Sequence, residues 1–103
     1  MNDFYDRQIA LLRRLISDYR AGALNLNSLI QRIEAITAAL GSAKWKDDVF
    51  PLILSMEQIN AVAIESKRHL TASEQIIVED AVREIESLIK RTETEKNSAA
   101  QFK

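Results

Sequence analysis

Residues 45–64 read WKDDVFPLILSMEQINAVAI, and this stretch decides how the chain folds. An α-helix turns by about 100° per residue, so it brings residues three and four apart onto one face. One face of such a helix is apolar throughout, with Trp45, Val49, Leu52, Ile53, Met56, Ile59 and Ala63. The opposite face is mixed, because Phe50, Leu54 and Ala61 lie there among acidic side chains. A helix that is apolar nearly all round is buried on several sides, or is buried on one side and offers the other to a partner.

Pro51 leaves two interpretations of this helix. Proline has no backbone N–H, and its ring clashes with the carbonyl four residues back, at Asp47. Either one helix runs over residues 43–68 with a kink at Pro51, or the main helix starts near Pro51, where proline suits a first turn. The single kinked helix is the favoured prediction.

Two further helices are predicted before this stretch. Apolar residues recur at helical spacings over residues 3–20, and Gly22 can take the positive φ of a C-terminal cap. A second stripe begins after Asn25 or Asn27 and runs to Leu40. The next two residues are a glycine and a serine, which can end one helix and cap the next. Such a short connection favours an antiparallel helical hairpin.

The last helix has the clearest start signal. Thr71, Ala72, Ser73 and Glu74 match the capping box, in which Thr and Glu side chains satisfy each other's backbone donors. The predicted apolar face holds Ile77, Val78, Ala81, Val82, Ile85, Leu88 and Ile89. From Thr92 the apolar period is lost. We therefore expect one domain over residues 1–92 and a frayed polar tail over 93–103.

Four amphipathic segments with short connections predict an all-α fold, an antiparallel four-helix bundle. The composition agrees, since 103 residues include only two glycines and one proline, while 47% are apolar and 28% charged.

The sequence carries few residues that could form an active site. His69 is the single histidine and cysteine is absent, so no metal-ligand set is expected. The two glycines are too far apart for a phosphate-binding loop. We expect neither an enzyme nor a bound cofactor or metal. The acidic N-terminus lacks a signal-peptide pattern and no stretch is long and apolar enough for a membrane helix, so a cytoplasmic protein is expected.

Charge is unevenly distributed along the chain. Residues 1–46 hold seven basic and four acidic residues, whereas residues 47–82 hold two basic and seven acidic residues. An acidic surface with apolar neighbours suits a basic protein partner, because charge speeds encounter and apolar contacts hold the complex. The candidate partner-binding residues are Trp45, Asp47, Asp48, Phe50, Leu54, Glu57, Glu65, Glu79 and Asp80.

Two other functions stay open. The first two helices carry arginines that could lie on nucleic-acid phosphates, namely Arg7, Arg13, Arg14, Arg20 and Arg32. A calculated pI of 5.8 argues against that alternative, a nucleic-acid-binding or regulatory protein. Self-association through the second apolar stripe of residues 45–64 is the other possibility.

A resemblance to a known class of proteins covers roughly residues 3–66. It rests on the runs DFYDRQIALLRRLISDYRAGALNLNSLIQRIEAI and WKDDVFPLILSMEQINA. Within them, Tyr19-Arg20-Ala21-Gly22 forms a Tyr-x-x-Gly turn and Ile33-Glu34-Ala35-Ile36 ends an apolar helix. This pattern resembles small helical immunity proteins of bacterial polymorphic-toxin and contact-dependent growth inhibition systems.

The resemblance implies a specific function. Such a protein would bind the C-terminal domain of its cognate toxin in the cytoplasm and would neutralise it by covering the active site. Many toxins of this kind are nucleases with basic clefts, which an acidic helical surface could match. The resemblance assigns no particular binding residues, so the acidic and apolar candidates above rest on physical argument alone.

Overall fold

The computed structural model describes the backbone of residues 3–101 and the side-chain surroundings of residues 4–94. Over this range the chain forms four helices. They are α1 (Asp3–Arg20), α2 (Leu26–Leu40), α3 (Ala43–Glu65) and α4 (Ala72–Gln101). The predicted all-α fold is confirmed.

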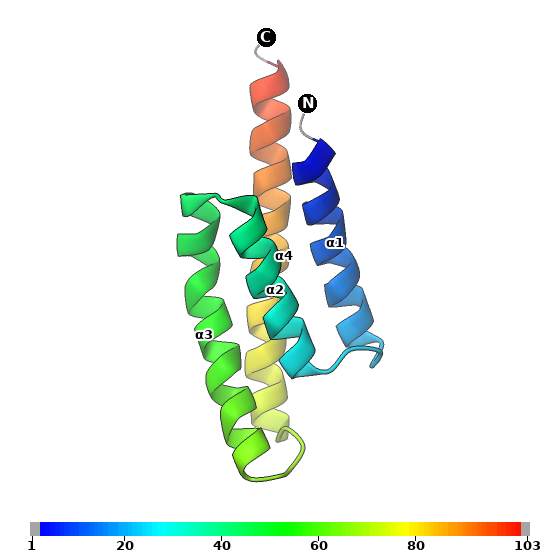
Figure 1. The fold of residues 1–103 in the computed structure, drawn as a ribbon, viewed down its shortest axis with the longest axis vertical. Coiled ribbons are helices and arrows are strands. Elements are labelled where there is room, and N and C mark those ends of the chain that lie inside the picture. Colours follow the sequence, from blue (N-terminus) through cyan, green and yellow to red (C-terminus); the bar gives the residue numbers. More distant parts are fainter. Residues whose placement is uncertain (1–2, 102–103) are drawn as a thin grey trace.

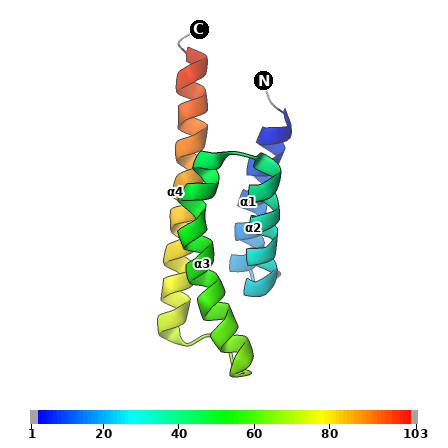
Figure 2. The same cartoon turned by 60° about the vertical axis from the view of Figure 1, so that its left-hand side comes forward.

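The helices form two antiparallel hairpins that pack side by side, α1 with α2 and α3 with α4 (Figures 1 and 2). Helix α2 also packs on α3, whereas α1 and α4 close the bundle with a looser backbone approach. The bundle measures 54 × 22 × 21 Å. Its length comes mainly from α4, which extends past the other helices at its C-terminal end (Figure 1).

Local signals in the sequence set the ends of α1 and α2. Gly22 has a φ of +80°, and the Ala23 N–H reaches the Asp18 carbonyl at 2.9 Å, which closes the last turn of α1. The Asn25 side chain accepts a hydrogen bond from the Ser28 N–H at 2.8 Å and caps α2. Gly41 then ends α2 with a φ of +64°.

Helix α3 is continuous through Pro51. Its first turn is capped by Ser42, whose hydroxyl accepts from the Trp45 N–H at 3.2 Å, so the alternative start near Pro51 is wrong. Pro51 and Asp47 are both exposed, which lets water satisfy the carbonyl that the missing N–H leaves free. The helix ends at Glu65, three residues earlier than predicted, because Lys67 adopts a left-handed φ of +53°.

The capping box at the start of α4 is confirmed. The Thr71 N–H donates to Glu74 Oε1 at 2.9 Å, and the Glu74 N–H donates to Thr71 Oγ1 at 3.1 Å. Ile89 is the last buried side chain of α4 in the range 72–94, although the helical backbone continues to Gln101. A frayed tail over residues 93–103 therefore stays a prediction.

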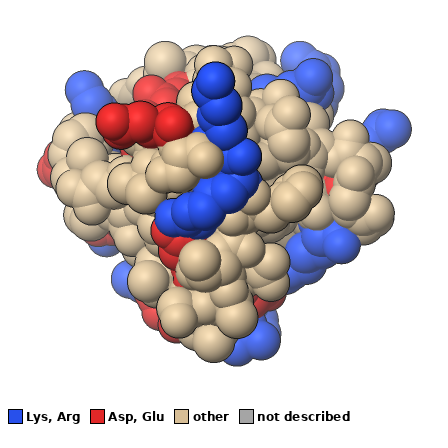
Figure 3. Space-filling view, turned by 90° about the horizontal axis from the view of Figure 1, so that it is seen from below, with Lys and Arg blue, Asp and Glu red and all other residues tan. Residues whose placement is uncertain are grey.

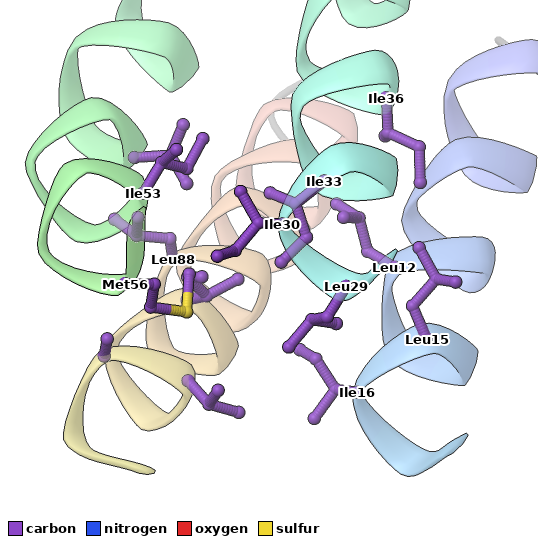
Figure 4. Close-up of a cluster of buried hydrophobic side chains, with 14 of the residues drawn as sticks. Leu12, Leu15, Ile16, Leu29, Ile30, Ile33, Ile36, Ile53, Met56 and Leu88 are labelled. Atoms are coloured by element: carbon purple, nitrogen blue, oxygen red, sulfur yellow. The ribbon is translucent and has the colours of Figure 1, made fainter. Parts of the chain in front are cut away.

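The core is built from the predicted helical stripes. Side chains of all four helices meet along the bundle axis, and Figure 4 shows Leu12 and Ile16 of α1 facing Leu29 and Ile33 of α2. Most of the predicted face of α4 is buried. Ile77 is the exception, with 45% of its surface exposed, because the stripe facing the bundle begins one residue later, at Val78.

Candidate functional site

Large apolar side chains lie on the outer face of α3. Phe50 is 56% exposed and Leu54 is 42% exposed, while Ala61 further along the same face is also exposed. Because these residues recur at helical spacings, they form one apolar strip on the side of α3 that the bundle does not use. The second stripe that the sequence predicted for this helix is therefore on the surface.

A groove of about 580 Å³ runs between α2 and α3 beside this strip. It exists because α2, the connection after it and the start of α3 present Ala38, Gly41 and Ala43, which are too small to fill the furrow between two helices. Larger apolar side chains form its other wall. The complete lining is Glu34, Thr37, Ala38, Gly41, Ser42, Ala43, Lys46, Val49, Phe50, Ile53 and Glu57.

Two carboxylates face each other at one end of this groove. Glu34 of α2 and Glu57 of α3 come from different helices and share a side-chain hydrogen bond. That bond raises the pKa of Glu34 above its ordinary value, and partial burial and the charge of Glu57 raise it further. Among the described residues, neither carboxylate forms an ion pair with a basic side chain. Within the part of the chain that the structure describes, the groove thus ends in a pair of carboxyl groups without a basic partner.

The other end of the groove carries a basic side chain, Lys46. Lys46 and Glu57 are eleven residues apart on α3, which corresponds to about 16 Å at the helical rise. The groove is therefore apolar along its length and has opposite charges at its two ends.

Trp45 is not part of the exposed strip. It is only 4% exposed, and its indole N–H donates to the Thr37 hydroxyl at 3.0 Å. The structure thus places this candidate in the core, where it joins α3 to α2.

The acidic candidates do not form one continuous surface. Asp47 is exposed on α3, and Asp48 pairs with Lys44 at 3.5 Å. Glu65 is exposed at the end of α3, about two turns beyond Glu57. Asp80 is exposed on α4, which makes no close backbone contact with α2. Of the candidate partner-binding residues, only Phe50 and Glu57 line the groove.

Glu79 belongs to a different contact, between α1 and α4. Arg20 donates to Glu79 at 2.6 Å and to both oxygens of Glu86 at 2.8 Å, and Arg13 pairs with Glu93. The arginines are seven residues apart and so are the three glutamates, which is the spacing that keeps side chains along one helix–helix seam. These hydrogen bonds raise the pKa of Arg20 and lower the pKa of Glu86.

This seam changes the interpretation of the arginine-rich face. Arg13 and Arg20 neutralise acids of α4, whereas nucleic-acid binding needs them for phosphates. Seen from the end that carries the 21–25 and 66–71 connections, basic and acidic side chains are interspersed on an uncharged surface (Figure 3). That end of the molecule offers no broad basic patch.

Within the part of the chain that the structure describes, no group of three potential ligands could hold a metal ion. His69 is exposed at the junction of α3 and α4. None of the helices in the described range is long and apolar enough to cross a membrane.

Sequence reasoning missed Glu34 and Lys46 as site residues. Each is unremarkable on its own helix, and only the register between α2 and α3 brings Glu34 to Glu57. The sequence did contain a signal for the α1–α4 seam. Arg13 and Arg20 are seven residues apart, and Glu79, Glu86 and Glu93 of α4 have the same spacing.

The fold and the groove define this chain as an all-α bundle with an apolar, partly acidic surface over α2 and α3. Searches against protein-family models, curated proteins and solved structures each found no match.

Proposed function

We propose that this protein is an immunity protein, which binds a cognate bacterial toxin domain in the cytoplasm and neutralises it by covering its active site. The observation that carries the proposal is the exposure of Phe50 and Leu54 beside the α2–α3 groove. Aromatic side chains dominate the energetics of protein interfaces, and a half-exposed phenylalanine next to an apolar groove is a suitable anchor.

The acids around the groove give this surface a preferred partner. Asp47 is exposed one turn before Phe50, and Glu57 lies two turns after it. A basic surface would approach such a face faster than a neutral one, and apolar contacts would then slow its dissociation. Active-site clefts of nucleases are basic because their substrate is a polyanion, so a nuclease domain is the favoured partner.

The first experiment is isothermal titration of this protein against the C-terminal toxin domain encoded immediately upstream of its gene. The expected result is tight one-to-one binding with loss of the domain's activity. Absence of both heat and inhibition would overturn the proposal.

Matched variants locate the interface. Leu54→Asp is expected to weaken binding by at least about tenfold, as loss of a central interface residue does. Leu11→Asp is the control, because Leu11 is 43% exposed on α1 and Leu54 is 42% exposed on α3. Equal affinity of both variants would exclude the α3 face while leaving the immunity function standing.

Asp47→Lys tests the electrostatic part of the proposal. It is preferable to reversal of Glu79 or Asp48, since those residues already pair within the bundle. We expect a slower association rate, and a difference from the wild type that shrinks as salt is added.

A further inference from the structure

We propose that the α2–α3 groove binds an amphipathic helix of the partner protein, with an arginine or lysine of that helix between Glu34 and Glu57. This inference deepens the proposed function and rests on it in one respect, that the partner is a protein. The groove shape and its charges each support a separate part of the assignment.

The shape of the groove suits a helix. Its walls are two antiparallel helices, and the ridges of a third helix fit the furrow between two others. Over its length of about 16 Å, a helix makes three turns and can present apolar residues at positions i, i+3 or i+4, and i+7. The small residues Ala38, Gly41 and Ala43 leave the depth that such side chains need.

The carboxylate pair selects a basic side chain. Two carboxylates this close repel each other when both are ionised. The pKa of Glu34 is raised by its hydrogen bond with Glu57, then by partial burial, and also by the charge of Glu57. A guanidinium or ammonium group between them would hydrogen bond to both and would remove the repulsion. Arginine fits best, because its planar fork can engage a carboxylate through two parallel bonds.

Lys46 fixes the direction of the bound helix. It lies at the groove end opposite Glu34 and Glu57. A helix with a basic residue at one end and an acidic residue about three turns away would pair at both ends. The reversed helix would place like charges together at both ends, which costs affinity.

Other occupants fit the groove less well. A nucleic acid would bring phosphates to two carboxylates, which repel them. A second copy of this chain is the remaining protein candidate, and self-association measurements distinguish it from a separate partner.

The test uses a displayed library of helical peptides about four turns long, selected on the immobilised full-length protein. Enriched peptides are then titrated against the wild type, the Glu34→Gln/Glu57→Gln variant, Phe50→Asp and the control Leu11→Asp. Glutamine keeps the side-chain volume and removes the repulsion, so the double variant is expected to stay folded, as circular dichroism would verify.

The expected peptides carry apolar residues at i, i+3 or i+4 and i+7, and an arginine or lysine at one end. Their affinity should fall at least about tenfold on the double variant and on Phe50→Asp, and should be unchanged on Leu11→Asp. Peptides without a basic residue, affinity that is indifferent to the double variant, or a lack of any enrichment would each overturn the inference.

Sedimentation of the protein alone completes the test. Self-association that Phe50→Asp abolishes would make a second copy the occupant and would overturn the inference, whereas a monomer supports it.

Titration with the upstream toxin domain distinguishes this inference from the proposed function. If it binds equally to the wild type and the double variant, this inference fails and the proposed function stands. If it does not bind but basic helical peptides do, the proposed function fails and the groove assignment stands.

Discussion

The indole N–H of Trp45 donates a hydrogen bond to the hydroxyl oxygen of Thr37 at 3.0 Å, where the end of α2 meets the start of α3. Trp45 is 4% exposed and Thr37 is 9% exposed, so water has little access to either group. Both residues flank the two-residue connection at Gly41 and Ser42. The bond therefore joins the two helices that form the groove.

Replacement of Thr37 by valine should destabilise the protein. Valine keeps the shape of threonine but cannot accept a hydrogen bond, so the indole N–H is left unsatisfied in the core. The expected loss is about 1–3 kcal/mol in the free energy of unfolding. Urea unfolding followed by the fluorescence of Trp45, the single tryptophan, measures it directly. Thr37→Ser retains the hydroxyl and should lose less; a serine variant as unstable as valine would argue that the lost methyl group is responsible.

Arg20 should stabilise the α1–α4 contact, which is the loosest helix pairing in the bundle. Its guanidinium binds two glutamates, so Arg20→Ala should cost about 1 kcal/mol, the upper end for ion pairs at the surface. For a domain of this size that is a fall of about 4–8 °C in melting temperature.

Arg14→Ala is the control for this prediction. Arg14 pairs with Asp18 only at 4.0 Å and its side chain is 80% exposed, so its removal should change the melting temperature little. The difference in melting temperature between Arg20→Ala and Arg14→Ala should become smaller at high salt, because the Debye length falls to about 3 Å at 1 M. Equal melting temperatures at low salt would show that the seam contributes nothing.

Much of the fold could be predicted from the sequence because the signals for it are local. Gly22, Asn25, Ser42 and Thr71 act within a few residues of themselves, and their caps set helix ends in the structure as predicted. The apolar stripes also follow from helical spacing alone. Lys67 shows the limit, since a lysine in the left-handed region carries no sequence signal for the end of α3.

The candidate surface was less predictable because it depends on the register between helices. A tryptophan at helical spacing is more often a core residue than an interface residue, yet only the burial of Trp45 against Thr37 decides for the core. Glu79 looked like a solvent-facing acid until the packing of α1 brought Arg20 to it. The groove itself arises from missing side-chain volume at Ala38 and Gly41, which helical periodicity does not report.

Glu74 should contribute stability that is lost in acid. Its bonds to Arg68 and to the Thr71 backbone lower the pKa of Glu74 to about 2. Since an unfolded glutamate titrates at about 4.3, this contribution is complete above that pH and is lost as the pH falls toward 2. Glu74→Gln keeps a capping side chain but not the charge. The wild type should therefore be the more stable at neutral pH, and the melting temperatures of the two proteins should converge as the pH falls to about 2.

Glu34 should have the opposite effect, because its pKa is raised in the folded protein. The folded state then holds the proton at pH values where the unfolded chain has lost it, so stability falls as the pH rises through the raised pKa. Glu34→Gln removes the repulsion with Glu57 and should melt at a higher temperature than the wild type near neutral pH. This gain in melting temperature should shrink toward pH 4, where the wild-type carboxyl of Glu34 is protonated.

Glu84→Gln replaces an exposed acid of α4 and is the control for this prediction. It should show no such trend. If Glu34→Gln raises the melting temperature at neutral pH and also weakens binding of a basic helix, the repulsion between Glu34 and Glu57 lowers the stability of the free protein and favours binding of a basic partner.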